Sequence, residues 1–355
     1  MNAEGNERSV SADPRLARFS RQSLFTPFGE SGTKALIHAR VTLIGCGALG
    51  GVLANTLVRA GLGWLRIIDR DFIELDNLQR QVLFDEHDVS SDLPKAEAAA
   101  RKLRKVNSAA EIDAVVADVN HANAEDLCRD SDLLLDGTDN FETRFLLNDV
   151  AVKHRIPWVY GACVASDGLV LPILPRQTPC LRCIWEDAPP PGMTPTCDTA
   201  GVLSPVVNIV ASLQAMEAMK ILAGKLDALN RNLVTIDVWS GQIRSIDMQS
   251  AYDKGDCPCC KHERYEFLAG ERVSASTSLC GRNAVQVRPS GSGRVDFKEL
   301  ASRLKPGARP TFNAYLMRFS VDPYAITLFP DGRAIIKGTN DPAVARSVYA
   351  KYIGA

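Results

Sequence analysis

The chain has 355 residues, of which 46% are hydrophobic and 23% are charged, enough apolar sequence for one large core and a smaller second core. The formal net charge of −1 excludes a whole-protein field that would attract nucleic acid or an anionic membrane surface. We find no apolar stretch long enough to span a bilayer, so we expect a protein without membrane association.

Strands and helices are predicted to alternate through the first half of the chain. The polar residues 1–17 lack the apolar core of a signal peptide and are interpreted as a disordered lead-in. Short apolar runs then predict strands, and segments of helical spacing lie between them. The predicted strands are 40–44, 65–69, 111–116, 132–136 and 157–160, and the predicted helices are 52–60, a helix after Pro94, and 141–154. This alternation predicts an α/β fold with a doubly wound, Rossmann-like, mainly parallel sheet.

The pattern changes after Gly161. A strand is predicted at 169–174, followed by a proline-rich loop, a long apolar helix at about 206–223 and a hairpin at 233–247. The composition changes again near residue 264, and the tail is predicted to form a small α+β domain. The expected domains are the lead-in 1–17, a nucleotide-binding domain with zinc knuckles at 18–263, and a C-terminal domain at 264–355.

A glycine loop follows the first predicted strand directly. Gly45, Gly47 and Gly50 match the pattern G-x-G-x-x-G between a strand and a helix. Such glycines let the backbone approach a phosphate, and the helix N-terminus points free N–H groups at the anion. Asp69 lies about twenty residues later, where a carboxylate can bind ribose hydroxyls. The loop therefore predicts an adenine nucleotide; a glycine turn that only serves tight packing is the alternative.

Three further clusters favour ATP over NAD. They are Arg18-Phe19-Ser20-Arg21-Gln22, the segment from Asp71 through Asn77-Leu78-Gln79-Arg80-Gln81 followed by Pro94-Lys95, and Asp136-Gly137-Thr138-Asp139-Asn140, and we count Asp71 and Asn140 among the candidate nucleotide-binding residues. Cleavage of ATP between the α- and β-phosphates builds charge on the departing pyrophosphate, so several cations are needed. Arg21, Arg80 and Lys95 can supply them. Asp139, at the end of a strand, can hold Mg²⁺.

Structural interpretations of the same residues remain open. Arg21 alone is typical of a solvated surface charge. Lys95 at a helix start opposes the helix dipole and requires an anionic partner. Asn140 and Arg144 can cap and pair on their own helix, and Asp71 can cap the turn that follows it.

Ten cysteines in a chain of this length favour a reducing cytoplasm, because no disulfide staples are needed. Two pairs have the spacing C-x-x-C, which is typical of a closed, tetrahedral and structural zinc site. The expected ligands are Cys180, Cys183, Cys257 and Cys260. Cys259 and His262 are nearby alternatives. Cys46, Cys128, Cys163 and Cys280 are interpreted as small buried hydrophobic residues.

Together these motifs resemble the ThiF/MoeB family, the bacterial relatives of the ubiquitin-activating enzymes, from about Arg18 to Cys260. The run Ser212 to Lys220 contributes to this resemblance. The resemblance implies an ATP-dependent adenylyltransferase that activates the C-terminal glycine carboxylate of a ubiquitin-like sulphur carrier of the ThiS or MoaD type. Pyrophosphate would be released, and thiamine-thiazole or molybdopterin synthesis would be served.

The resemblance also implies residue roles. The residue matching Asp69 binds ribose, and those matching Asn77, Arg80 and Lys95 bind phosphates. The residue matching Asp139 lies beside Mg²⁺. The arginine matching Arg21 reaches the nucleotide of the other subunit, which implies a homodimer.

Cys197 lies outside both zinc knuckles. In this family, a cysteine at this place is a candidate for a covalent bond to the carrier, and a cysteine desulphurase or a rhodanese-type protein is the implied sulphur donor. The neighbouring Asp198 would not favour the thiolate. The tail resembles a C-terminal extension of some ThiF-like proteins, and a role in holding carrier or donor is a hypothesis.

Two other functions are compatible with part of the pattern. An NAD-dependent oxidoreductase would use the same glycine loop, but it leaves Arg21, Arg80, Lys95 and the zinc knuckles unexplained. A non-catalytic docking module for a ubiquitin-like protein would not need a complete nucleotide site.

Overall fold

The computed structural model describes residues 14–187, 196–272, 277–279, 283–287, 295–304 and 308–354. Residues 1–13, most of the expected lead-in, lie outside this part, but helix α1 (Pro14–Ala17) begins before residue 18. The chain divides into two compact units. The first comprises Met1–Ala188 and Leu203–Leu268, and the second comprises Pro189–Val202 and Ala269–Ala355.

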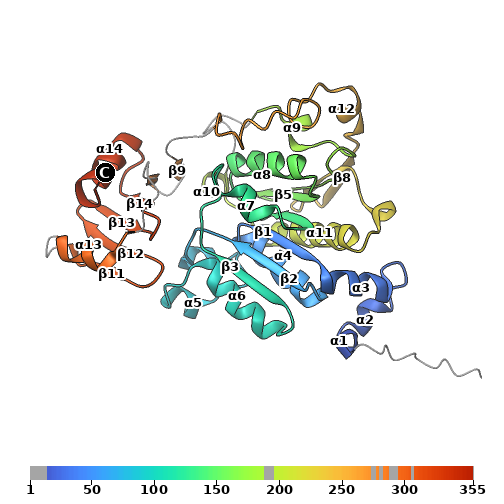
Figure 1. Ribbon diagram of the computed structural model, residues 1–355, viewed down its shortest axis with the longest axis horizontal. Coiled ribbons are helices and arrows are strands. Elements are labelled where there is room, and N and C mark those ends of the chain that lie inside the picture. Colours follow the sequence, from blue (N-terminus) through green and yellow to red (C-terminus); the bar gives the residue numbers. More distant parts are fainter. Residues whose placement is uncertain are drawn as a thin grey trace, which may run out of the picture. The chain divides into compact units, whose positions relative to one another are not determined.

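The first unit is built on an eight-stranded sheet with the order β3-β2-β1-β4-β5-β6-β7-β8 (Figure 1). Strands β1 to β5 run parallel, and β6, β7 and β8 are antiparallel. The strands are β1 (Arg40–Ile44), β2 (Trp64–Ile68), β3 (Glu111–Val115), β4 (Leu133–Asp136), β5 (Trp158–Val164), β6 (Asp167–Ile173), β7 (Leu233–Asp237) and β8 (Gln242–Ile246). The predicted mainly parallel, Rossmann-like sheet is confirmed. In register, Ile44 lies beside Ile68 and Asp136, so three strands end at one edge.

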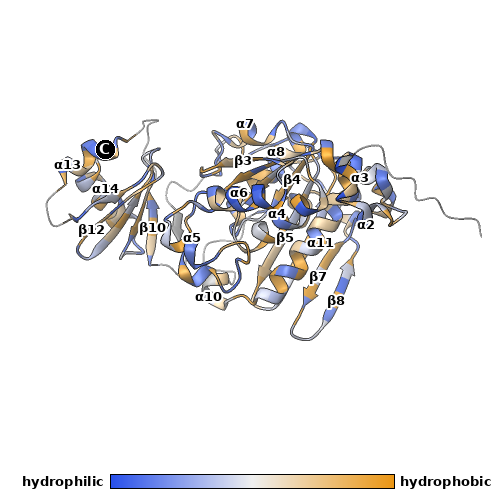
Figure 2. Ribbon diagram, turned by 90° about the horizontal axis from the view of Figure 1, so that it is seen from below, coloured by the Kyte–Doolittle hydropathy of each residue, from blue (hydrophilic) through white to orange (hydrophobic). Residues whose placement is uncertain are grey.

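Helices cover this sheet, and Figure 2 shows hydrophobic strands beside a largely hydrophilic α6. The helices are α2 (Ser20–Ser23), α3 (Gly29–His38), α4 (Ala48–Ala60), η1 (Leu75–Asn77), α5 (Glu86–Ser90), α6 (Lys95–Val106), α7 (Ala124–Cys128), α8 (Phe141–His154), α9 (Leu181–Ile184), α11 (Ser204–Leu222), η2 (Leu226–Ala228) and α12 (Gln249–Lys254). Helix α4 ends at Gly61 with φ +102°, the left-handed conformation that glycine adopts without strain.

Helix α11 corrects one expectation. By length and composition it could cross a membrane, whereas the sequence was expected to hold no such stretch. Half of its most apolar window is buried inside the unit, where it packs on α4, β5 and β6. Its apolar character is therefore that of a core helix, which needs no polar face where it is covered on several sides.

The second unit contains a six-stranded sheet, of order β11-β12-β13-β14-β10-β9, in which all pairs are antiparallel. Its elements are α10 (Cys197–Ala200), β9 (Thr277–Leu279), β10 (Ala284–Val287), α13 (Phe297–Arg303), β11 (Thr311–Phe312), β12 (Met317–Val321), β13 (Tyr324–Leu328), β14 (Ala334–Lys337) and α14 (Pro342–Tyr352). Alternate residues of β12, β13 and β14 pack with α13 and α14 into a separate core. The side chains of Asp296 and Asp341 cap the two helices.

Candidate active site

The glycine loop is locked against the end of β4. The N–H of Gly45 donates to the carbonyl oxygen of Ile68 at 2.8 Å, and its φ is +86°. A Cβ on Gly45 would lie 2.5 Å from the carbonyl oxygen of Gly137, and one on Gly50 would lie 2.0 Å from that of Gly45. These contacts explain Gly45 and Gly50 by close packing, the alternative that the sequence left open.

Gly47 has a different environment. A Cβ there would meet, among the described residues, only Nε2 of Gln81, at 3.7 Å. Gly47 is also the N-cap of α4, whose first N–H groups have no partner within the helix. Packing within the described chain therefore does not require a glycine at this point. A phosphate seated on the helix N-terminus fits the space that a side chain would fill.

Asp69 ties this loop to β2. Its Oδ2 accepts the N–H of Cys46 at 2.6 Å, and its Oδ1 accepts the N–H of Asp71 at 2.7 Å. Burial raises the pKa of the Asp69 carboxyl, and the nearby charge of Lys95 opposes that rise. Each carboxylate oxygen has a second acceptor position, so a ribose hydroxyl can still be bound.

Lys95, at the start of α6, is buried with 3% of its surface exposed. Its N–H donates to the carbonyl oxygen of Asp71 at 2.9 Å, and its Nζ lies 3.7 Å from Asp71 Oδ2. Its charge also acts on Asp69 and Cys46. A buried cation at a helix start needs anions nearby, and the two aspartates meet the requirement that the sequence predicted.

Asn77 and Arg80 lie in the turn after β2. Asn77 is buried; its Oδ1 accepts the N–H of Glu74 at 3.3 Å, and its Nδ2 donates to Asp76 at 3.0 Å. The half-buried Arg80 donates to the carbonyl oxygen of Asp76 at 3.0 Å. Since Arg80 makes no ion pair within the described part of the chain, its charge is available to an anion.

A buried ion pair holds the loop after β4. Oδ1 of Asp136 accepts the N–H and the hydroxyl of Thr138 at 2.8 and 2.7 Å, and Oδ2 accepts Nε of Arg144 at 3.1 Å. Arg144 also donates to the carbonyl oxygen of Thr138 at 2.7 Å. Asn140 caps α8, which is the structural alternative that the sequence left open. The loop is fixed from the core side, while Asp139 is exposed.

Two further predicted site residues are carried by the short helices α2 and α10. Arg21 is exposed on α2 and makes no ion pair among the described residues. Cys197 is half-buried at the start of α10, which belongs to the second unit.

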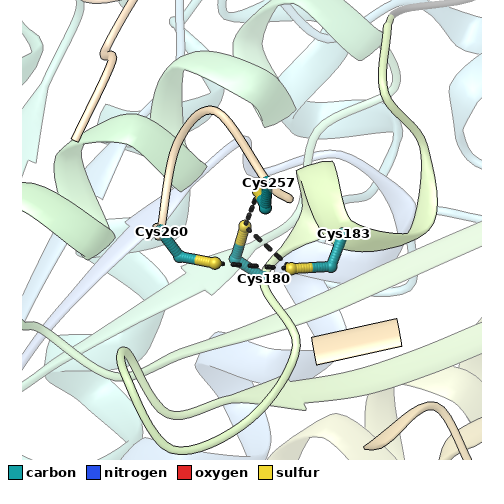
Figure 3. A group of neighbouring side chains, drawn as sticks. All are labelled: Cys180, Cys183, Cys257 and Cys260. Atoms are coloured by element: carbon teal, nitrogen blue, oxygen red, sulfur yellow. Dashed lines mark hydrogen bonds between the residues drawn. The ribbon is translucent and has the colours of Figure 1, made fainter. Parts of the chain in front are cut away.

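Four cysteines form the predicted cluster (Figure 3). The Sγ–Sγ distances are 3.6 Å for Cys180–Cys257, 3.8 Å for Cys180–Cys183 and 3.4 Å for Cys183–Cys260, and all four sulphurs lie within 4.8 Å of one another. Tetrahedral zinc with Zn–S bonds of about 2.3 Å separates its sulphurs by about 3.8 Å. The cluster therefore fits zinc, and it joins α9 to the segment after α12.

The fifth thiol of this region is held differently. Cys259 is fully buried, and its Sγ donates to Asp149 Oδ1 at 3.4 Å and accepts Nδ2 of Asn148 at 3.3 Å. The exposed His262 pairs with Asp256. These contacts favour Cys257 and Cys260 as ligands of the second knuckle. Cys46 and Cys128 are buried as expected, Cys163 is half-buried, and Cys280 lies outside the described residues.

Two neighbours of the site were missed from the sequence. Arg70 bonds Asp118 at 2.8 Å and adds positive charge beside Asp71 and Asp139. Gln81 is buried, and its Oε1 has no hydrogen-bond partner among the described residues. The only signal for Gln81 was its position next to Arg80, within the second cluster.

Comparisons with known proteins agree with this geometry. The model of the ThiF family matches residues 19–259. The "Sulfur carrier protein ThiS adenylyltransferase" of Bacillus subtilis is 45% identical over 339 residues, which cover 95% of this chain and 99% of that protein. The "SAMP-activating enzyme E1" of Haloferax volcanii is 37% identical, over a match that covers 69% of this chain and 89% of that protein. A crystal structure of E. coli MccB with ATP shares the fold, with a TM-score of 0.59 and 24% sequence identity. The match covers 70% of this chain and 74% of that chain.

Proposed function

The chain belongs to the ThiF family, and from this premise we propose that it is an ATP-dependent adenylyltransferase for the C-terminal carboxylate of a ubiquitin-like sulphur-carrier protein. The observation that carries the proposal is the cradle at the carboxyl edge of the sheet, where Gly47, the N-terminus of α4 and buried Lys95 meet. The name of the Bacillus relative, which matches 95% of this chain, supports a carrier of the ThiS type. With such a carrier, the thiamine-thiazole synthesis that the family resemblance implies is the pathway we propose.

The chemistry requires no protein base, because the carrier's C-terminal carboxylate is ionised at neutral pH. One carboxylate oxygen attacks the α-phosphorus of ATP. The bond from that phosphorus to the bridging oxygen of the β-phosphate breaks, which gives the acyl-adenylate and pyrophosphate. Catalysis then consists of positioning and of stabilising charge on the departing pyrophosphate.

We assign residue roles on this basis. The Asp69 carboxylate, already fixed by two N–H groups, would accept ribose hydroxyls. Asn77, Arg80 and Lys95 would contact the phosphates, and the exposed Asp139 would hold Mg²⁺, which neutralises phosphate charge when bound. The rigid loop beneath Asp139 supports this role, since a metal ligand must be held in place.

Partners follow from the same proposal. The exposed Arg21, without an ion pair in the described chain, would complete the site of a second copy in a homodimer. The terminal sulphur of a persulphide on a desulphurase or rhodanese-type donor would attack the acyl carbon of the adenylate and release AMP. A thiol reductant would then cleave the resulting acyl disulphide to the thiocarboxylate, and Cys197 is the candidate for a covalent intermediate. Nine free thiols among the described residues support a reducing, cytoplasmic setting.

The test is ATP–pyrophosphate exchange with ThiS-type and MoaD-type carriers that end in Gly-Gly. We expect exchange that depends on a carrier and that Asp139→Ala lowers by about 100-fold or more. Asp126→Ala, which removes an exposed carboxylate on α7, is the matched control and should leave exchange unchanged. Lack of exchange with every carrier, from zinc-loaded dimeric protein, would contradict the proposal.

A further inference from the structure

Gln81 is directed into the protein by the turn that carries it. Its N–H donates to the carbonyl oxygen of Asn77 at 2.9 Å, and its carbonyl oxygen accepts the N–H of Phe84 at 3.0 Å. Gln81 is 4% exposed, whereas the next residue, Val82, is 54% exposed. Leu83 lies against the first turn of α4, where its Cβ would be 3.3 Å from a Cβ on Gly51. The turn therefore packs over the helix start that follows the glycine loop.

The side-chain amide of Gln81 faces the cradle at Gly47. Its Nε2 lies 3.7 Å from the place of a Cβ on Gly47, and its Oε1 has no hydrogen-bond partner in the described part of the chain. Buried amides in folded proteins are nearly always hydrogen-bonded, since a group left unpaired loses its water without compensation. A donor for Oε1 is therefore expected to arrive with a ligand, and Nε2, the amide atom nearest to Gly47, is the one that can donate to an anion there.

The surroundings define the chemistry of that ligand. The N-terminus of the thirteen-residue helix α4 and the ammonium of Lys95 both favour an anion at Gly47. Resting on the proposed function, we propose that Gln81 is a nucleotide-contacting residue whose amide N–H donates to a phosphate oxygen of ATP bound over Gly47. Its Oε1 then accepts a hydrogen bond from water that enters with the nucleotide.

Gln81 differs in kind from the cations around it. An amide donates a hydrogen bond without adding charge, so it fixes where the phosphate lies while Arg80 and Lys95 offset its charge. Its removal should weaken ATP binding and leave the free protein folded. Replacement by an isosteric carboxylate should be worse, because an anion would then face the phosphate.

The test measures equilibrium binding of magnesium and α,β-methylene-ATP, a non-cleavable analogue, to the full-length zinc-loaded protein. We expect about tenfold weaker binding for Gln81→Leu and a larger loss for Gln81→Glu. The exposed Gln177, which follows β6 and belongs to none of the nucleotide clusters, gives matched controls, and Gln177→Leu and Gln177→Glu should bind within about twofold of wild type. Thermal unfolding without nucleotide should be unchanged or raised for Gln81→Leu, which removes an unpaired buried group.

Wild-type affinity in Gln81→Leu, with an unchanged melting temperature, would overturn the assignment. Absence of analogue binding by the wild-type protein would overturn it as well. Analogue binding that depends on Gln81, without pyrophosphate exchange for any carrier, would leave this assignment standing and remove the proposed function instead. If Gln81→Glu does not fold, the nucleotide affinity and the melting temperature of Gln81→Leu decide whether the assignment holds.

Discussion

At the scale of single residues, the three glycines of the loop are equivalent in the sequence pattern, but the structure gives them different roles. Gly45 and Gly50 are glycines because the loop closes on backbone atoms of Gly137 and of itself. Gly47 has space beside it that the described chain does not fill. The pattern predicts a nucleotide site in either case, but which glycine serves packing depends on a turn about ninety residues away.

This difference gives the first prediction. Gly50→Ala places a Cβ 2.0 Å from a backbone oxygen, so it should destabilise the fold by about 3 kcal/mol or more. Gly47→Ala should destabilise it far less, yet weaken ATP binding about tenfold, because its methyl group occupies the cradle. Urea unfolding and nucleotide titration of both variants measure the two effects. Equal loss of stability in both would contradict the interpretation of Gly47.

Residue types alone also could not reveal the partners of the buried charges. The sequence predicted that Lys95 needs an anion, but it did not identify that anion. Asp71 and Asp69 become its partners because α6 starts beside the end of β2. Arg70 and Gln81 were missed because an arginine or a glutamine after a strand is typical of exposed loops.

At the scale of elements, α8 connects the two sites of the first unit. Its first turns carry Arg144, which holds the loop of Asp139, and its middle carries Asn148 and Asp149. Asn148 Oδ1 accepts the N–H of Leu181 at 2.8 Å, in the first zinc knuckle. Asp149 Oδ2 accepts two N–H groups of the segment after the second knuckle. The polar face of this helix is therefore turned inward.

We expect Asn148→Leu to accelerate loss of zinc. The substitution removes the acceptor of the Leu181 N–H and the donor to Cys259, which together orient both knuckles. Loss of such supporting bonds lowers metal affinity by roughly 10- to 100-fold. Zinc release to a chromogenic chelator provides the measurement, and Lys153→Met, at an exposed position of the same helix, is the control. Equal release rates for the two variants would disprove the role of Asn148.

Helix α8 also shows what element prediction can achieve. Its bounds, 141–154, match the prediction because Asn140 caps it and the apolar residues are frequent. Helix α3 was not predicted, since Gly29 and Gly32 argue against a helix. The ring of Phe28 packs where Gly32 has no side chain, and Phe28 and Leu36 pack with Ala60 of α4, so tertiary contact outweighs helix propensity there.

At the scale of the whole molecule, the alternation of strands and helices was sufficient to predict the Rossmann-like sheet, and the change of composition near residue 264 indicated the small α+β tail. The antiparallel strands β6 to β8 extend the sheet beyond the parallel part, where the hairpin around Gly241 was predicted. The match to 99% of the Bacillus relative requires that most of the second unit is shared with it. The proposed association of two copies needs its own test. Arg21 is exposed in the single chain, so the role proposed for it depends on a second copy.

Subunit mixing tests whether Arg21 acts on the partner's nucleotide. Arg21→Ala and Asp139→Ala should each be inactive alone. If the arginine acts across the interface, a mixed dimer keeps one intact site, formed by Asp139 of one protomer and Arg21 of the other. Random exchange of equal amounts should then restore about a quarter of wild-type pyrophosphate exchange, because half of the dimers are mixed and each has one working site of two. If Arg21 serves its own subunit, every site in the mixture lacks one residue, and exchange should stay at the level of the single variants. A gel-filtration profile confirms that both variants remain dimeric, so that failure to complement reports on the arginine and not on assembly.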